Sequence, residues 1–292
     1  EYLPPKDPAV THVVINSLVQ AELSQRSGVE STIVPNVFDF TGNPWGIDEY
    51  NRGFRRAIGV NENDIVLLQA TRIVERKGIE LAVDLAVELN EPHHIATLRK
   101  SGLYDGRRFD ANSRIVLVLA GSSEDDNTDY LGRLKRKIEQ AWIETRFIAD
   151  KIRSQREEDD GRRLYSLWDC YVFADLVTYP SLFEGFGNQF LEAIRAKLPV
   201  ALFEYPVYRA DIKKKGFNVI SLGSNVAGRD DLGLVSAGEE TVRKAAKEAV
   251  EVLTDPLSRR EMVERNFALG LESYSLEHLG KRLDEIVEQA AS

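Results

Sequence analysis

Two glutamates flank a pair of glycines in residues 181–192, a combination that could bind a phosphorylated sugar. Gly185 and Gly187 let the backbone approach a ligand closely and adopt positive φ. The segment follows an expected strand and opens an expected helix, whose free N–H groups and dipole favour an anion such as phosphate. Glu192, just past the first helical turn, could accept two hydrogen bonds from the vicinal diol of a ribose. Glu184, on the loop, is free to contact a second part of the same ligand.

A purely structural explanation of this segment is also open. Glycines form turns, and an acid near a helix N-terminus complements the helix dipole. Asn188 suits the N-cap position of the expected helix. For the glycine pair alone, this structural explanation is the simpler one. It accounts less well for two glutamates separated by seven residues across a strand–loop–helix joint, so we predict a binding site here.

A group of cations, Arg72 and Lys77, follows another expected strand. Arginine can grip phosphate oxygens bidentately, and lysine acts as a point charge, so the pair suits a diphosphate. In a reaction that expels a nucleoside diphosphate, these cations would stabilise the charge that grows on the leaving group. The alternative is a surface cluster in which Arg76 only pairs with Glu75 or Glu80. Because both charged segments are expected at the same sheet edge, we favour a functional role.

Apolar strands that alternate with amphipathic helices are expected to position these residues. Residues 65–70 and 115–120 are continuous apolar runs, typical of strands buried on both faces. The repeated strand–helix order predicts an α/β fold with a doubly wound parallel sheet, in which ligands bind at the carboxyl ends of strands. Further strands are expected at 11–16, 32–34, 176–179, 200–203 and 218–222, and helices at 17–28, 50–58, 78–89, 130–152, 164–174, 188–197, 239–253, 259–271 and 276–290.

Two polar segments are expected to lie outside the chemistry. His93 and His94 fall in the polar segment 91–113, which we interpret as a surface excursion. No ligand-spaced partner suggests a metal site around these two histidines. The charge run at 153–163 is expected to be solvated.

Composition excludes several classes of protein. The 292 residues include 38 Lys and Arg against 47 Asp and Glu, a net charge of −9, which argues against a nucleic-acid partner. We find no charged-then-apolar leader and no apolar run near the roughly 20 residues of a membrane span. The single cysteine, Cys170, cannot form an internal disulfide, so we expect a cytoplasmic location. The chain starts at Glu1 and its one methionine is Met262, so we expect a fragment or trimmed form of a longer protein.

Three segments carry a resemblance to a known family: TRIVERKG, VLAGSS and YPSLFEGFGNQFLEAIRAKLPVAL. Together they resemble the nucleotide-binding half of a GT-B glycosyltransferase of the large retaining family GT4, whose hallmark is the Glu184-x7-Glu192 pair. The likeness implies a Rossmann-like, nucleotide-sugar-binding C-terminal domain at residues 41–255. Residues 1–40 would then be a remnant of the N-terminal acceptor domain with the linker, because VPNVFD at 34–39 is similar to the interdomain segment. Residues 256–292 would be C-terminal helices that cross toward the N-terminal domain.

The resemblance also implies roles for individual residues. Arg72, Lys77 and Glu184 would be catalytic, with the two cations on the donor diphosphate and Glu184 facing the hydroxyls of the donor sugar. Retention would follow from attack on the face that the diphosphate leaves. Neither a cofactor nor a metal is expected, and the metal-binding D-x-D motif of GT-A transferases is absent from the sequence. The donor would be a UDP-, GDP- or ADP-sugar, bound by Glu184, Gly185, Phe186, Gly187, Asn188 and Glu192.

Three functions remain open. The first is the donor-binding part of a retaining hexosyltransferase of carbohydrate metabolism, and the second is a non-catalytic nucleotide-sugar-binding module. The third is a GT-B-type nucleotide-sugar epimerase, over which the paired glutamates favour the transferase. About 60 residues precede the first buried strand of the expected C-terminal domain, too few for a complete acceptor domain, so the second function stays open. We expect the parent protein to contain the missing N-terminal domain.

Overall fold

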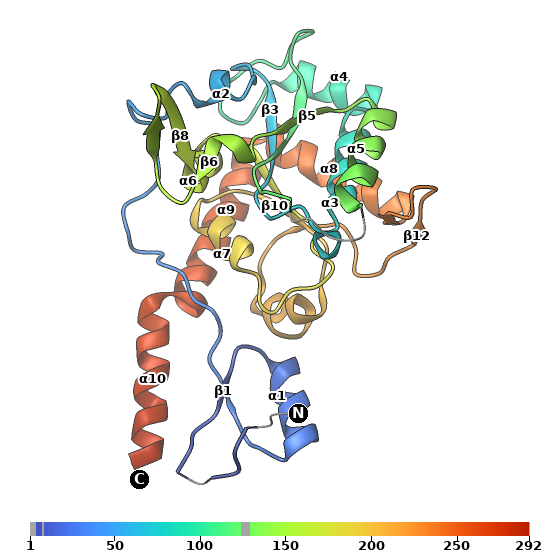
Figure 1. Cartoon of the computed structure of the whole chain (residues 1–292). Helices are drawn as coiled ribbons and strands as arrows, with labels where there is room; N and C mark the ends of the chain where they lie inside the picture. Colours follow the sequence, from blue (N-terminus) through green and yellow to red (C-terminus); the bar gives the residue numbers. More distant parts are fainter. Residues whose placement is uncertain (1–3, 8, 124–128, 292) are drawn as a thin grey trace.

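The two uninterrupted apolar runs form adjacent strands, β3 (Ile65–Gln69) and β4 (Ile115–Leu119), at the centre of a six-stranded parallel sheet (Figure 1). The computed structural model describes residues 4–7, 9–123 and 129–291. The strand order is β11-β10-β9-β3-β4-β5. Counted along the chain from β3, this is the 3-2-1-4-5-6 order of a doubly wound Rossmann sheet, so the predicted fold is confirmed. The other strands are β5 (Glu144–Phe147), β9 (Leu176–Tyr179), β10 (Val200–Leu202) and β11 (Ile220–Ser221).

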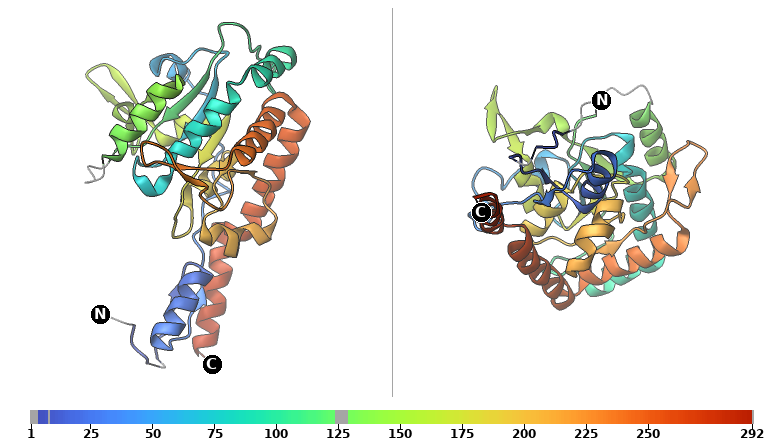
Figure 2. Two further views of the ribbon diagram at one scale, coloured as in Figure 1. Left: turned by 90° about the vertical axis from the view of Figure 1, so that its right-hand side faces the viewer. Right: turned by 90° about the horizontal axis from the view of Figure 1, so that it is seen from below.

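Alternate side chains of the central strands enter two separate apolar layers. Ile65 and Leu67 of β3 pack in one layer, whereas Val66 and Leu68 pack in the other, because successive side chains of a strand point to opposite faces. Helices cover both faces, as the two views in Figure 2 show. The first layer includes residues of α3 (Ile79–Leu89), α4 (Pro92–Ser101), α5 (Tyr130–Ala141) and α8 (Glu239–Thr254), and the second includes residues of α2 (Phe54–Ala57), α6 (Leu167–Val172) and α7 (Asn188–Arg195).

A small N-terminal unit lies apart from the sheet. It consists of β1 (Val13–Val14), α1 (Ser17–Ser27) and β2 (Thr32–Ile33), with β1 and β2 paired in parallel. The expected strand–helix–strand order is present, but Asn16 rather than Ser17 caps α1, because its Oδ1 accepts the Val19 N–H at 2.8 Å.

The chain returns to this unit at its other end. Helix α9 (Pro256–Tyr274) contacts both α7 and α8, and α10 (Leu276–Ala291) then runs beside the N-terminal unit (Figure 1). The contact between α10 and the unit includes Arg282, whose Nε donates to the carbonyl oxygen of Ile33 at 3.5 Å.

The prediction of one long helix at 130–152 is wrong. Helix α5 ends at Ala141, and Trp142 adopts the left-handed conformation with φ +54°. The chain then enters β5, which pairs with β4 at the edge of the sheet. Because an edge strand faces solvent, β5 carries the polar sequence ETRF and shows no apolar run that would have marked it.

The charge run at 153–163 forms part of a second, small sheet. Strands β6 (Ile152–Arg153), β7 (Glu157–Asp159) and β8 (Arg162–Ser166) lie in the order β6-β8-β7. Residues 154–163 are exposed, as predicted for a solvated run. Helix α6 starts later than predicted, since Leu164 belongs to β8 and a capping box between Ser166 and Asp169 sets the start at Leu167.

The remaining elements are short. They are the 3₁₀ turns η1 (Glu75–Lys77), η2 (Ala149–Lys151) and η4 (Lys213–Lys215), the π-turn η3 (Tyr208–Ile212), and the hairpin of β12 (Gly228–Arg229) and β13 (Val235–Ser236). Within the part of the chain that the structure describes, every helix is too short or too polar to cross a membrane.

The loops that follow β3 and β4 are in direct contact, and this contact requires a glycine. The Ile73 N–H donates to the Ser122 carbonyl at 2.8 Å. A Cβ atom on Gly121 would lie 1.9 Å from the backbone oxygen of Thr71, a distance that the loops could relieve only by moving apart.

Replacing Gly121 with alanine is therefore expected to lower the free energy of unfolding by about 1–3 kcal/mol, the usual cost of overpacking. Urea denaturation measures this change. Gly46→Ala is the control, because a Cβ there meets no atom within 4 Å and the backbone φ is not positive, so its expected effect is within about 0.5 kcal/mol. If the two variants were equally stable, the contact between the loops could accommodate a Cβ atom at position 121, contrary to this prediction.

Candidate functional site

The loops after β3 and β9 meet where the strand order of the sheet reverses. β3 and β9 are hydrogen-bonded neighbours, and the helices that follow them, α3 and α7, cover opposite faces. The Leu182 N–H donates to the Arg76 carbonyl at 2.9 Å. Gly78 has φ +56°, and a Cβ there would lie 2.6 Å from the Pro180 carbonyl oxygen. The two loops predicted to act together are thus in contact at the switch point, where open α/β sheets bind ligands.

An ion pair between Lys77 and Glu184 joins these two loops. Lys77 Nζ donates to Glu184 Oε1, and Arg76 Nη1 lies 3.4 Å from Glu184 Oε2. Lys77 and Glu184 are both buried, with 8% and 9% of their surfaces exposed. Burial lowers the pKa of Lys77, and the carboxylate of Glu184 opposes that shift. A phosphate is an acceptor of the same charge type as a carboxylate, so it could take the place of Glu184 on Lys77.

The alternative in which Arg76 only pairs with its neighbours along the chain is wrong. Glu75 faces other cations, Arg133 and Arg229, each at 3.3 Å. Glu80 is fully buried and accepts the hydroxyl hydrogen of Tyr130. Arg76 instead extends to the loop after β9, where its Nη1 lies 3.4 Å from Glu184 Oε2 and donates to the Phe183 carbonyl at 3.3 Å.

Glu192 of α7 belongs to the same electrostatic group. The Tyr171 hydroxyl on α6 donates to Glu192 Oε2 at 2.7 Å. Burial raises the pKa of Glu192, whereas this hydrogen bond and the positive charge of Lys77 act in the opposite direction. Because the charge of Lys77 acts on Glu192, the ammonium and this second carboxylate lie within electrostatic range of each other.

Arg72 is exposed and lies on the loop between β3 and η1. Its charge and that of Arg76 both lower the pKa of Lys77 through repulsion between like charges. The structure therefore brings Arg72, Lys77, Glu184 and Glu192 into one electrostatically coupled group. Their roles toward a ligand stay a prediction.

Gly185 and Gly187, in the loop after β9, differ in whether the fold requires glycine at their positions. Gly187 has φ +126°, and a Cβ there would lie 2.1 Å from Tyr205 Oη, so no other residue fits. Gly185 is exposed, and a Cβ there would meet Ile15 Cδ1 at 3.5 Å, an ordinary contact distance. The fold thus requires glycine at 187 but not at 185, where its absence of a side chain leaves the backbone accessible.

Two other residues of the loop lie differently from the prediction. Asn188 was expected to cap α7, but Gly187 occupies the N-cap and Asn188 is the first helical residue. The Asn188 Oδ1 instead accepts the Asn36 side-chain amide at 2.7 Å. Phe186 is buried against Tyr274 in an edge-to-face contact, and its carbonyl accepts the Tyr205 hydroxyl at 2.7 Å, so its side chain and its carbonyl both serve the core.

Sequence reasoning missed two residues at this site. Tyr171, which holds the Glu192 carboxylate, lies 21 residues earlier on a helix that carries no motif. Asn16, from the N-terminal unit, donates from Nδ2 to the Gly185 carbonyl at 2.6 Å. Neither contact leaves a local signal, because each partner is far away in the chain.

His93 and His94 do not lie in a surface loop, as the sequence had suggested. Both belong to the first turn of α4, where Pro92 starts the helix, and His94 is buried with 6% of its surface exposed. Glu88, near the end of α3, lies beside them, although no ligand spacing marks it in the sequence. The helix break at residues 90 and 91 hides this proximity from a pattern search.

The sequence of the chain is similar to a known protein family and to named relatives. The chain matches the family described as "Glycosyl transferases group 1" over residues 51–268. It is 43% identical over 276 residues to mannosylglucosylglycerate synthase of Petrotoga mobilis, which covers 92% of this chain and 60% of that protein. Its identity to the protein of the same name from Thermotoga maritima is 38% over 279 residues, or 96% and 61% of the two chains. The chain thus spans about three fifths of the length of these relatives.

Solved structures share the fold at low sequence identity. HepE of Anabaena, crystallised with UDP and glucose, aligns with a TM-score of 0.62 at 14% identity over 95% of this chain and 62% of that chain. A glycosyltransferase of Rickettsia africae aligns with a TM-score of 0.64 at 14% identity over 100% and 69% of the two chains. Together with the family match over most of the sheet and its site loops, these findings show that the chain belongs to the glycosyl transferases group 1 family.

Proposed function

We propose that this chain is the donor-binding part of a retaining hexosyltransferase that uses a nucleoside-diphosphate sugar and needs no metal ion. One observation carries the proposal: a buried ion pair between Lys77 and Glu184, with Arg76 Nη1 3.4 Å from Glu184 Oε2, joins two loops at the switch point of a Rossmann sheet, and Arg72 and Glu192 lie on the same two segments. A diphosphate, a ribose and a hexose together offer the anionic and diol groups that such a set can bind.

In this proposal each side chain meets a different part of the donor. Lys77 and Arg72 contact the diphosphate, Glu192 accepts hydrogen bonds from the ribose diol, and Glu184 faces the sugar hydroxyls. When donor binds, Lys77 exchanges the carboxylate of Glu184 for phosphate oxygens, which frees Glu184 for the sugar. The N–H groups at the start of α7 add a further positive field near the phosphates.

The transfer step itself proceeds on one face of the sugar. The bond between the anomeric carbon and the diphosphate oxygen breaks, and its electron pair stays on the diphosphate. The acceptor hydroxyl oxygen bonds to the anomeric carbon on that same face, and its proton passes to the departing diphosphate. Arg72 and Lys77 stabilise the charge that develops on the leaving group, which is the largest contribution expected of the protein.

The names of the relatives support a choice of sugar and acceptor. Both relatives are called mannosylglucosylglycerate synthase, a name that describes a product with mannosyl, glucosyl and glycerate units. We propose a mannosyl unit as the transferred hexose and a glucosylated glycerate as the acceptor of the complete protein. The chain spans about three fifths of these relatives, so we propose that the acceptor site also uses residues from the part of such a protein that this chain does not span.

A thermal-shift panel tests the proposal. UDP, GDP, ADP and their hexose derivatives, each at about 100 times an expected micromolar Kd, should give one preferred base, with stabilisation of about 2.7 kcal/mol and a shift of roughly 5 °C. Mannose alone and inorganic phosphate are the controls, and EDTA should leave the shift unchanged. No shift and no calorimetric heat with any nucleotide would refute donor binding, and a shift that EDTA abolishes would refute metal independence.

A further inference from the structure

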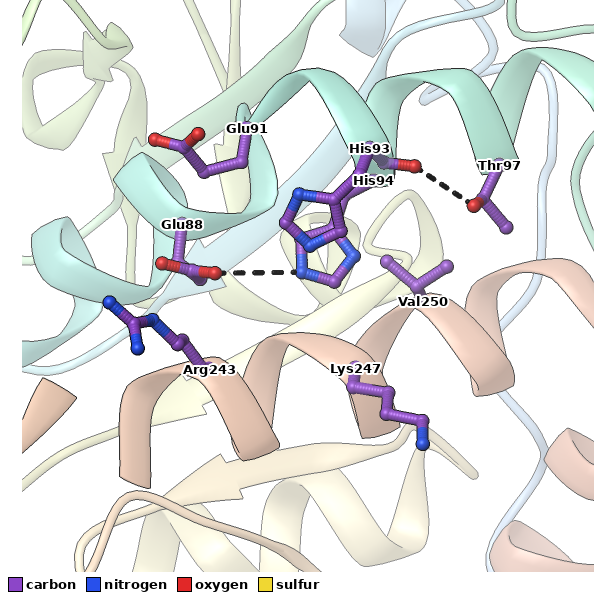
Figure 3. A pocket seen from close by; sticks show the side chains of 8 residues that line it. All are labelled: Glu88, Glu91, His93, His94, Thr97, Arg243, Lys247 and Val250. Atoms are coloured by element: carbon purple, nitrogen blue, oxygen red, sulfur yellow. Dashed lines mark hydrogen bonds and ion pairs between the residues drawn. The ribbon is translucent and has the colours of Figure 1, made fainter. Parts of the chain in front are cut away.

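A second polar cluster lies far from the candidate donor site, where α3 turns into α4 (Figure 3). Its members are Glu88 of α3 and the adjacent His93 and His94 of α4. The His94 Nε2 atom is buried and has no hydrogen-bond partner among the described residues. The nearest carboxylate oxygen, Glu88 Oε1, lies 3.7 Å away, too far for a hydrogen bond. The cluster thus contains a buried imidazole nitrogen that makes no hydrogen bond within the described residues.

The spacing of this cluster suits a shared metal ion better than a direct hydrogen bond. One donor atom from each of Glu88, His93 and His94 lies within 4.8 Å of the others. Ligands on one tetrahedral zinc, bound at about 2.0–2.1 Å, are themselves about 3.3 Å apart. The 3.7 Å between His94 Nε2 and Glu88 Oε1 is close to that separation. The imidazole rings of the two histidines have centroids 3.9 Å apart and overlap in Figure 3, with the Glu88 carboxylate to one side of them.

We propose that Glu88, His93 and His94 bind one divalent transition-metal ion of the zinc class. Two imidazoles and one carboxylate are a ligand set that zinc uses when a fourth position stays open to water or another ligand. The cluster opens into a cavity of about 690 Å³ that is also lined by Glu91, Arg243 and Lys247. His93 is exposed, so an ion can enter from solvent and a small anion can complete the coordination.

The ion would act on stability rather than on the transfer reaction. Helix α3 begins beside Lys77 at the carboxyl edge of the sheet and runs antiparallel to the strands, so Glu88 lies at the opposite edge. A bound ion joins the end of α3 to the start of α4, and both helices pack against α8. Metal binding to the folded chain therefore raises its stability in proportion to the logarithm of the free ion concentration once the site is saturated.

Isothermal titration of the metal-free chain with ZnCl₂ tests this site. We expect one Zn²⁺ per chain, at least a tenfold loss of affinity in both Glu88→Gln and His93→Ala, and visible d–d absorption of tetrahedral Co²⁺ that both variants lose. His93 is exposed, so His93→Ala should fold normally, as circular dichroism would verify. His278→Ala, at a histidine outside the cluster, is the matched control and should bind zinc as tightly as the unaltered chain.

Two results would overturn the site. One is the absence of zinc binding by the unaltered chain at millimolar concentration, and the other is equal affinity in Glu88→Gln, His93→Ala and the control. Thermal shifts induced by nucleotide, measured on the same variants, distinguish this metal site from the candidate donor site. The variants should keep these shifts, because the cluster does not touch the loops that carry Lys77 and Glu184.

Discussion

Replacing Lys77 with alanine is expected to lower the affinity for a nucleoside diphosphate by about tenfold to a hundredfold. The reason is the loss of a charge-assisted hydrogen bond of about 1.5–3 kcal/mol to the diphosphate. In a protein that also supplies the acceptor site, turnover should fall further, by about 10² to 10³, since the charge on the leaving group loses a preorganised partner. Calorimetry with the diphosphate and initial-rate measurements with the donor sugar check the two effects.

The Lys77→Ala substitution also leaves Glu184 buried without its main partner, which destabilises the fold by itself. The double variant Lys77→Ala, Glu184→Gln removes that charge, so it should recover stability without recovering nucleotide affinity. Lys244→Ala is the control, because Lys244 is exposed on α8 and pairs with Glu248 at 3.9 Å. A double variant that binds nucleotide as well as the unaltered chain would show that the ion pair is only structural.

Replacing Glu192 with glutamine is expected to weaken nucleotide binding at least tenfold and, at neutral pH, to raise the unfolding midpoint by a few degrees. The side-chain amide of the variant can still accept the Tyr171 hydroxyl, but a neutral amide binds a ribose diol less strongly than a carboxylate does. The gain in stability follows because burial raises the pKa of Glu192, so its ionised form is disfavoured in the folded state. Thermal denaturation with and without ligand measures both effects.

The pH dependence of this gain has a definite sign. Above the raised pKa of the folded state, Glu192 is ionised in the folded and unfolded chains, and the full penalty of the buried charge applies. As the pH falls through the folded pKa toward that of an unfolded glutamate, about 4.3, the carboxyl takes up a proton and the difference between the two proteins closes. The stability advantage of Glu192→Gln should therefore be largest at neutral pH and vanish in acid.

Glu248→Gln provides the matched control for this experiment. Burial also raises the pKa of Glu248, which lies on α8 away from the candidate donor site. Its replacement should leave nucleotide affinity unchanged. If Glu192→Gln bound nucleotide as tightly as Glu248→Gln, the ribose assignment would be wrong.

The sequence by itself determined the sheet and the principal charges of the site. The apolar runs at 65–70 and 115–120 indicated strands buried on both faces, which the structure confirms at 65–69 and 115–119, and the loops that follow parallel strands lie at one sheet edge. The spacing of Glu184 and Glu192 across a loop and one helical turn therefore predicted that both carboxylates would lie near the cations after β3. These inferences succeeded because they depend on local periodicity and on strand direction, and short segments of sequence are sufficient to infer both.

The tertiary structure alone decided which partners complete each group. The edge strand β5 went unnoticed, because a polar strand lacks the apolar pattern that buried strands show. Tyr171 meets Glu192, Asn16 meets Gly185, and Glu88 meets His94 only after distant or separately oriented helices pack together. Side-chain contacts of this kind depend on how whole elements pack in three dimensions, and no spacing along the chain records that packing.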